Sequence, residues 1–548
     1  MKVSILSYLR KYGFFPAPSL FLLQWLDLRG WRTGGPGSKK RNTKKEVLLV
    51  IGILISAGVV MVFNSLPFLI FFPAVVILYF ISPHRYRWAL LLGASFFFYM
   101  YWKPDYIVLL IIPTLISYLS GVALGRTGDP SRRKMILILG LGASLTPLFI
   151  FKYLNFVNEL LRGIIQWIGP SYPVTLFHWI LPVGISFYTF KAMSYTIDVY
   201  RRKIGPEPHL GIFALYVSFF PQLLAGPIER SDHLIPQFHE KFDFEGQRVF
   251  DGLKIMIWGL FKKVVIADRV SILVNQVYNH PENYSGLPLL VATVFFAFQI
   301  YCDFSGYSDM AIGAAQVMGF KVMDNFNRPY FAVSVSDFWR RWHISLSTWF
   351  RDYLYISLGG NRVVRWRWYY NLFITFLLSG LWHGAGWTFL IWGALHGFYF
   401  LFSIWTGEVR KKIVHWVGLD RFPAFHQTLK VIITFVCVCF AWIFFRAKTL
   451  SDAFYIMTHL FSEMGSIGHL KLAMRGLFDL GLERYEFYIG LGSIVMMECV
   501  EGVKRNGDIR DLFIGMPLLL RWMFYYVLIL SIILLGEYPE QGFIYFQF

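Results

Sequence analysis

Residues 105–124 read DYIVLLIIPTLISYLSGVAL, and this stretch decides the class of fold. After the opening aspartate it carries no charged side chain, and about 20 apolar residues suffice for an α-helix to cross a bilayer. Similar runs recur along the chain, which is 56% hydrophobic and only 16% charged. Because the runs are continuous rather than alternating, they argue against a membrane β-barrel. We therefore predict an all-α, polytopic membrane protein.

Other apolar segments extend this pattern on both sides. We expect spans or apolar segments near 47–63, 66–82, 86–102, 135–151, 177–199, 208–225, 250–267, 287–320, 369–403, 428–446, 485–499 and 519–536. The segments 287–320 and 369–403 are too long for one simple crossing, so each is expected to bend or to divide into two pieces. The segment 250–267 mixes lysine and aspartate into its apolar pattern, which is typical of an amphipathic or interfacial helix.

Basic side chains are unevenly distributed between the loops. The chain has 52 basic and 33 acidic residues, a net charge of +19. Seven of the basic residues lie within Arg29–Lys45, and others fall in alternate loops, near 85–87 and 126–134. The positive-inside rule places these segments in the cytoplasm. In a membrane protein such a face suits anionic lipids or an anionic substrate, and we expect no nucleic-acid partner.

The same pattern divides the chain into three parts. Residues 1–45 are expected to form a cytoplasmic basic segment, and residues 46–65 an additional N-terminal transmembrane helix. Residues 66–548 are expected to form the main membrane domain.

A second stretch, DFWRRWHISLSTWFRDYLYISLGGNR at residues 337–362, places arginines and a histidine among aromatic residues. The S-x-x-D spacing of Ser334 and Asp337 predicts a helix start, and Gly359 and Gly360 predict its end. One face of this helix carries Trp339, Trp342, Leu346, Trp349 and Tyr353. Two alternatives remain open: an interfacial helix with snorkelling arginines, or a charged helix facing protein or water at bilayer depth.

Polar members of this stretch are candidate site residues. Asp337 and Arg341 are four residues apart and are expected to pair. His343 lies at the border of the aromatic face, on the side of Ser347. Its imidazole is the titratable group of this stretch that changes charge near neutral pH.

A third stretch, LLSGLWHGAGWTFLIWGALHG at residues 377–397, surrounds His383 with glycines. Small residues let helices approach closely and also allow a helix to break. An ionisable side chain deep in an apolar run indicates function by default, although a histidine hydrogen-bonded between helices remains an alternative. His396 in the same run is more simply explained as a packed histidine that bonds to a neighbouring helix.

Two further segments are ambiguous. Asp303 and Asp309 lie in the apolar run FQIYCDFSGYSDMAIG, where they could orient a histidine or bind a hydroxyl, or cap helix ends around Gly306. Pro221, Gly226 and Pro227 in FFPQLLAGPIER break a helix at its end, in a re-entrant turn lining a cavity or in an ordinary loop. We expect no metal site, because no third ligand accompanies the histidines.

In combination, these motifs resemble the membrane-bound O-acyltransferase family. The resemblance rests on the RRWH and WHG stretches, on the segments around Asp303 and Pro221, and on the C-terminal FIYFQF. It covers roughly Met61 to Phe548 and is greatest to the bacterial alginate O-acetyltransferase branch. Residues 1–60 depart from that pattern. The resemblance implies a ring of tilted and re-entrant helices around a central tunnel, in a multi-pass protein of the bacterial inner membrane.

The resemblance also implies roles for individual residues. His383, in the WHG motif, corresponds to the family's catalytic histidine and is expected to act as general base on an acceptor hydroxyl. His343, in the RRWH motif, is expected to position the acceptor or to stabilise an oxyanion. The remaining candidates are Arg340, Arg341 and Arg351 for the phosphates of the donor, and Asp303, Asp309, Asp337, Trp382 and Ser347 in supporting positions.

The resemblance further implies the substrates and partners. We expect no bound cofactor, and acetyl-coenzyme A as the acyl-donor substrate. The acceptor is expected to be a polysaccharide hydroxyl or a serine of an extracytoplasmic acetyltransferase-type partner protein, with membrane lipids around the chain. Two alternatives stay open: D-alanyl transfer to teichoic acid-type polymers, and a non-enzymatic transporter of lipid-linked sugar.

Overall fold

The computed structural model describes residues 61–169, 177, 180–224, 226–462, 478, 480–503, 517–538 and 544. Within these ranges every regular element is helical, which confirms the predicted all-α fold. Six of the described helices are long and apolar enough to cross a membrane, so the chain is a multi-pass membrane protein. The predicted basic segment 1–45 and nearly all of the added helix 46–65 lie outside the described residues.

The N-terminal part of the described chain consists of paired long helices. These are α4 (Leu66–Ile81), α5 (His84–Met100), α6 (Ile107–Arg126), α7 (Pro130–Leu148) and α8 (Leu154–Ile168). Ser65 caps α4 and Asp129 caps α7, because each side chain accepts a hydrogen bond from a backbone N–H of the first turn. Between α7 and α8 the chain forms one π-helical turn, η2 (Phe149–Tyr153).

A pair of long helices forms the core of the molecule. α13 (Gly246–Phe261) packs along α15 (Leu287–Met318), and the two backbones meet at glycines. A Cβ added to Gly259 would lie 2.5 Å from the carbonyl oxygen of Gly306. α15 is one continuous helix, so segment 287–320 does not divide into two pieces, which was one of the two expected alternatives. Protein covers most of α15, so the bilayer thickness does not limit its length.

The charged side chains between α13 and α14 (Asp268–Asn279) face inward. Lys262 and Lys263 lie on a π-helical turn, η3 (Lys262–Ala267), and each is only 3% exposed. They form ion pairs with α15 and with α14. The segment 250–267 is thus amphipathic, as predicted, but Lys262 and Lys263 face the protein interior, where ion pairs satisfy their charges.

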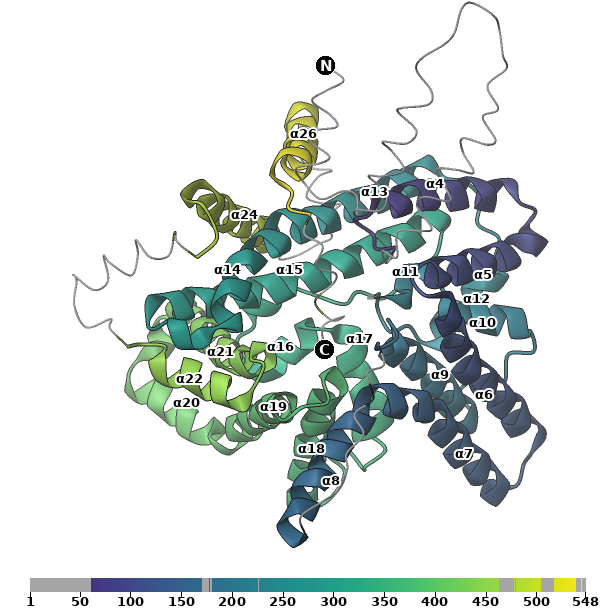
Figure 1. The fold of residues 1–548 in the computed structure, drawn as a ribbon, viewed down its shortest axis with the longest axis horizontal. Helices are drawn as coiled ribbons and strands as arrows, with labels where there is room; N and C mark the ends of the chain where they lie inside the picture. Colours follow the sequence, from purple (N-terminus) through teal and green to yellow (C-terminus); the bar gives the residue numbers. More distant parts are fainter. Residues whose placement is uncertain are drawn as a thin grey trace, which may run out of the picture.

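The segments around the site are shorter. They comprise α9 (Ile185–Tyr200), α10 (Leu210–Ser218), α11 (Phe220–Leu223), α12 (Ser231–His239), α16 (Val335–Arg341), α17 (Ile344–Trp349) and the π-helical turn η6 (Phe350–Tyr355). In Figure 1, α16 and α17 lie near the centre, with the band of α13–α15 above them and α8 below them, whereas the other helices from α5 to α10 lie at the right. The predicted helix break at Pro221 is confirmed, since α10 ends at Ser218 and the residues of α11 are buried.

The predicted single helix from Ser334 to Gly359 is divided in the structure. Ser334 caps its start, as expected, and Asp337 pairs with Arg341 at 3.0 Å. α16 then ends, and His343 adopts a left-handed φ of 43° before α17 begins. The spacing of apolar residues does not reveal this break, because apolar side chains are buried both before it, in α16, and after it, in α17.

The C-terminal half completes the enclosure. Its helices are α18 (Arg365–His383), α19 (Trp387–Trp405), α20 (Gly407–Trp416), α21 (Pro423–Arg446), α22 (Leu450–His459), α24 (Arg484–Val503) and α26 (Leu518–Leu535). The expected division of 369–403 is confirmed, because α18 and α19 are separate helices. They cross closely at glycines, where Cβ atoms added to Gly380 would approach Gly393 within 3.1 Å. α24 and α26 lie at the edge of the molecule (Figure 1).

Candidate active site

His383 is the last residue of α18, and the chain breaks immediately after it. Gly384 takes an extended conformation as the C-terminal cap, and Gly386 caps the start of α19. A Cβ on Gly384 would collide with the ring of Phe389, so the absence of a side chain lets that ring pack against the break. The imidazole of His383 is thereby held at a helix end inside the protein, where it is 2% exposed.

His343 lies at the other break, between α16 and α17, and is fully buried. Its Nδ1 lies 3.0 Å from Oδ1 of Asn325, and the same oxygen accepts hydrogen bonds from the backbone N–H and the hydroxyl of Ser345. Asn325 also binds Ile344 N through its carbonyl. Burial lowers the pKa of the His343 imidazole to about 3, so the ring is neutral.

The two breaks meet in space. The ring centroids of His343 and His383 lie 6.5 Å apart, and the Trp382 ring packs against both. Phe187 of α9 also stacks on His343. His396 lies on α19 and accepts a hydrogen bond from Trp339 Nε1, as expected for a packed histidine. Tertiary packing therefore places the two predicted catalytic histidines side by side among aromatic rings.

His383 borders a cavity of about 180 Å³. Its wall includes Trp382, Phe187 and Gly184, and it extends to Trp102 and Ile180. Ile180 is 56% exposed, so this end of the cavity reaches the surface. Trp102 follows the C-terminal end of α5, whereas Arg85 and Arg87 lie in its first turn. The lining of the cavity therefore includes a residue at the end of α5 opposite to these two arginines.

Sequence reasoning missed one residue of this cavity. Lys152 lies in η2 and lines the same cavity as His383. Its Nζ donates hydrogen bonds to the carbonyl oxygens of Trp382 and His383, at 2.7 and 2.8 Å. A lysine within the apolar run FIFKYLNF is an intramembrane ionisable group, and that signal was available in the sequence.

The three predicted donor-binding arginines lie away from this cavity, since none of them lines it. Arg340 is exposed, and Arg341 is engaged by Asp337. Arg351 is 60% exposed and forms an ion pair with Asp352 at 2.7 Å.

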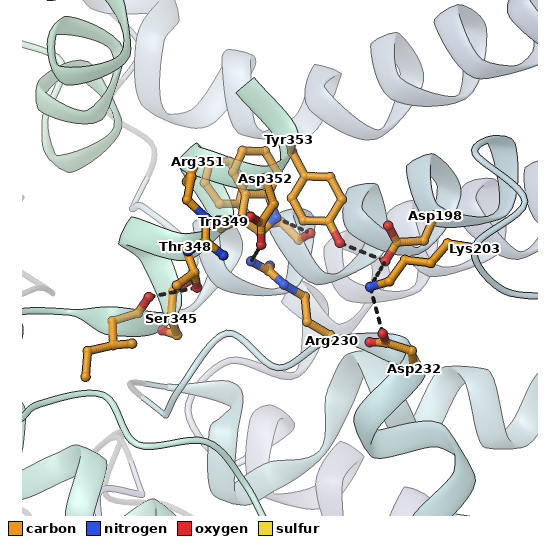
Figure 2. A network of polar contacts seen from close by, with 12 residues as sticks. Asp198, Lys203, Arg230, Asp232, Ser345, Thr348, Trp349, Arg351, Asp352 and Tyr353 are labelled. Atoms are coloured by element: carbon orange, nitrogen blue, oxygen red, sulfur yellow. Dashed lines mark hydrogen bonds and ion pairs between the residues drawn. The ribbon is translucent and has the colours of Figure 1, made fainter. Parts of the chain in front are cut away.

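Arg351 belongs to a polar network that joins η6 to the end of α9 (Figure 2). The Tyr353 hydroxyl donates to Asp198 at 2.7 Å, and Lys203 forms ion pairs with Asp198 and Asp232. Arg230 lies 3.6 Å from Asp352 and over the Tyr353 ring. The network gathers basic side chains where α9 and η6 end, next to the basic loop after α9.

The predicted supporting acids have other partners. Asp303 forms an ion pair with Lys263 and accepts a hydrogen bond from Ile544 N, which ties Ile544 to α15. Asp309 pairs with Lys262. Neither caps a helix end, because α15 continues through Gly306, so that alternative is wrong.

Ser347, the last supporting residue, donates to the carbonyl oxygen of Trp342. Its hydroxyl thus bonds the backbone at the break beside His343. The polar partner that does reach His343 is Asn325, which the sequence did not single out.

Comparison with known proteins places these features in a family. The model of the membrane-bound O-acyltransferase family matches residues 138–449, a range that includes both histidines. The chain is 43% identical over 404 residues to a probable alginate O-acetylase of Pseudomonas aeruginosa, with 73% of this chain and 75% of that protein covered. It is 36% identical over 409 residues to a peptidoglycan O-acetyltransferase of Helicobacter pylori, covering 69% and 74%. It is 26% identical over 323 residues to a teichoic acid D-alanyltransferase of Bacillus subtilis, covering 56% and 76%.

Proposed function

The chain belongs to the membrane-bound O-acyltransferase family, and from that membership we propose that it transfers an acetyl group from a cytoplasmic thioester, acetyl-coenzyme A, to a hydroxyl outside the cytoplasm. One observation carries the proposal. His383 borders a surface-reaching cavity with His343 beside it, in a chain that is 43% identical to a probable alginate O-acetylase. The proposal includes residence in the bacterial inner membrane.

The acyl group needs no further activation, because a thioester is already reactive. The reaction instead needs a base that removes the proton of the acceptor hydroxyl. His383 accepts the proton of the acceptor hydroxyl while the oxygen of that hydroxyl bonds to the carbonyl carbon of the thioester. The carbon–sulfur bond then breaks, and the imidazolium returns the proton to the leaving thiolate. The products are an acetyl ester and a free thiol, and the imidazole is regenerated. Imidazole suits this exchange because its ordinary pKa is about 6.5.

The hydrogen bonds around Asn325 favour one of the two roles expected for His343. Oδ1 of Asn325 accepts the backbone N–H of Ser345, so it is an acceptor, and Nδ1 of His343 must be the donor to it. The neutral ring then offers Nε2 as an acceptor, and this atom has no hydrogen-bond partner within the described ranges. An acceptor nitrogen can hold the hydroxyl of the substrate, whereas it cannot donate to an oxyanion. We therefore assign His343 to positioning the acceptor.

The two sides of the molecule suit different substrates. The cavity of His383 includes Trp102, beyond the end of α5 opposite to Arg85 and Arg87, which suits an acceptor that arrives from outside the cytoplasm. The basic network around Arg351 suits the phosphates of coenzyme A, and Arg340 and Arg341 lie in the same stretch. The immediate acceptor is a polysaccharide hydroxyl or a serine of an extracytoplasmic acetyltransferase-type partner. The greater identity to the acetylases than to the D-alanyltransferase favours acetyl over D-alanyl.

Acetyl-coenzyme A labelled in its acetyl group tests this proposal in membrane vesicles. Inside-out vesicles expose the cytoplasmic face, and there the label should pass to an extracytoplasmic polymer or partner protein. Right-side-out vesicles should transfer none, because the donor cannot reach its face. Label transferred only in right-side-out vesicles would refute the assigned sides. Purified chain that turns over no acetyl thioester with an acceptor present would favour the transporter instead.

A further inference from the structure

The π-helical turn η2 (Phe149–Tyr153) presents two adjacent polar side chains to the end of α18. The Tyr153 hydroxyl donates to the carbonyl oxygen of Leu381 at 3.1 Å. Lys152 Nζ donates to the next two carbonyl oxygens, of Trp382 and His383, at 2.7 and 2.8 Å. Three consecutive carbonyl groups, ending at His383, are thus bound by side chains from a distant part of the chain.

These carbonyl groups need partners because α18 stops at His383. The last carbonyls of a helix lack intrahelical donors and carry partial negative charge. Here the glycine break prevents another helical turn. The backbone N–H of Gly384 donates to the carbonyl oxygen of Gly380 at 3.4 Å, so it does not bind the last carbonyl groups of the helix. Buried carbonyls without donors are costly, so the side chains of η2 complete the end of the helix.

The type of side chain carries further information. A neutral donor such as the Tyr153 hydroxyl satisfies a carbonyl group without bringing a charge inside the protein. Lys152 brings an ionisable amino group and lines the cavity that His383 also lines. Its Nζ also lies 5.9 Å from the Trp382 ring centroid. π-helical turns often occur at functional sites, where the extra residue turns a side chain toward a target. Capping alone does not require a lysine in this place.

We propose that Lys152 is a positioning residue for His383. Its ammonium group grips the peptide group on each side of the His383 α-carbon and so holds the imidazole at the cavity wall. This inference rests on the proposed function, because it assigns Lys152 to the same acyl transfer. A lysine does this better than a neutral group, because a charge-assisted hydrogen bond is shorter and stronger.

The test compares Lys152→Met, Lys152→Arg and Lys152→Gln in the purified full-length chain, with Lys134→Met as the matched control. Lys134 is an exposed lysine on α7, the helix that leads into η2. Lys152→Met is expected to lower kcat by about 100-fold, as a misplacement near 1 Å can do, while KM for the donor changes little. Lys152→Arg should recover most of the rate, because guanidinium retains charged donors. Tyr153→Phe should lose less than Lys152→Met.

Thermal melting separates positioning from general destabilisation. A Lys152→Met protein that melts normally and transfers at more than half the wild-type rate would overturn the proposal. A rate loss that only follows the melting temperature would also overturn it. Where Lys152→Met does not fold, the other two variants decide. An active Lys152→Arg protein beside a folded but slow Lys152→Gln protein supports positioning. Equal transfer rates in these two variants overturn the proposal.

Hydrogen exchange gives a readout that needs no substrate. The amide hydrogens of residues 380–386 should exchange at least about tenfold faster in Lys152→Met than in Lys134→Met, because the helix end is released. Unchanged exchange would overturn the proposal. A wild-type chain that fails to transfer acetyl would instead count against the proposed function, and the exchange comparison would still test the grip of Lys152 on α18.

Discussion

The imidazole rings of His343 and His383 lie with their centroids 6.5 Å apart and their planes inclined by 59°. Each ring stands at a break between two helices, and each break has its own cause. A left-handed residue divides α16 from α17, and a glycine pair divides α18 from α19. This proximity is what the roles proposed for the two rings, on one acceptor hydroxyl, require.

Replacing His383 tests the assigned base. His383→Ala should lower acetyl transfer by about 10²–10⁴-fold, because the hydroxyl proton loses its acceptor. Melting temperature and donor binding should stay near those of the wild type. His396→Ala is the contrast, since His396 bonds Trp339 and should lose stability and rate together. Normal transfer by well-folded His383→Ala protein would rule out the base.

Replacing Asn325 tests the orientation of His343. Asn325→Ala removes the oxygen that accepts from His343 and Ser345, so buried donors lose their partner at a cost of about 1–3 kcal/mol. The imidazole is then free to turn, and kcat should fall by about tenfold or more. Initial rates at saturating donor, with melting curves, measure both effects. Ser308→Ala is the matched control, because it leaves Oδ1 of Asn325 in place. An equal loss in both variants would contradict the role of that oxygen.

Replacing Lys263 tests whether Asp303 acts in stability rather than in chemistry. Lys263 pairs with both Asp303 and Asp268, each at 2.7 Å. Lys263→Met leaves two buried carboxylates without their cation and should cost about 3–5 kcal/mol. Less folded protein should be extracted, while the rate per folded molecule is retained. Lys254→Met, at a more exposed pair with Asp251, should cost less than about 1 kcal/mol. A large loss of the transfer rate in stable Lys263→Met protein would instead indicate that Asp303 acts in the reaction.

Adding a methyl group at the helix crossing tests the packing of α18 on α19. A Cβ on Gly380 would collide with the carbonyl oxygen of Phe389, which is backbone and cannot turn aside. Gly380→Ala should therefore destabilise the protein by about 1–3 kcal/mol. Gly142→Ala on α7 is the control, because no atom lies within 4 Å of its added Cβ. Thermal melting of the two variants in the same detergent makes the comparison, and equal melting temperatures would contradict the close crossing.

His233 gives a pH dependence outside the spanning helices. Its Nδ1 binds Glu229 at 2.8 Å, and this hydrogen bond raises the pKa of the imidazole. A pKa raised in the folded state adds stability below the unfolded value of about 6.5, and this stability is lost as pH rises through the folded pKa. Because the side chain is 49% exposed, solvent screening limits the effect to about 1 kcal/mol or less. His233→Gln should thus lower the melting temperature at pH 5.5 more than at pH 9. A larger drop at pH 9 would contradict the ion pair.

Local patterns anticipated much of the fold. Apolar runs of spanning length predicted a multi-pass helical protein, and the helix start at Ser334 and the ion pair of Asp337 with Arg341 were confirmed. These features depend on neighbours within one or two helical turns, so the linear order of residues is enough to show them. The glycines around His383 likewise announced a break in the chain.

Contacts between distant segments decided the rest. α15 is one long, continuous helix that packs along α13. The lysines of η3 face the protein interior because they form ion pairs with aspartates of α15. Asn325 hydrogen-bonds to His343 and Ser345 at one break, and Lys152 donates hydrogen bonds to the last two carbonyl groups of α18 at the other. The spacing of residues along the chain does not reveal such partners. A polar group needs a hydrogen-bond partner within the protein only when the packing of the helices buries it. The sequence pattern therefore indicated a multi-pass membrane protein, and the resemblance of its motifs to a known family indicated an acyltransferase with two candidate histidines. Their meeting, and the side chains that hold them, follow from the tertiary structure.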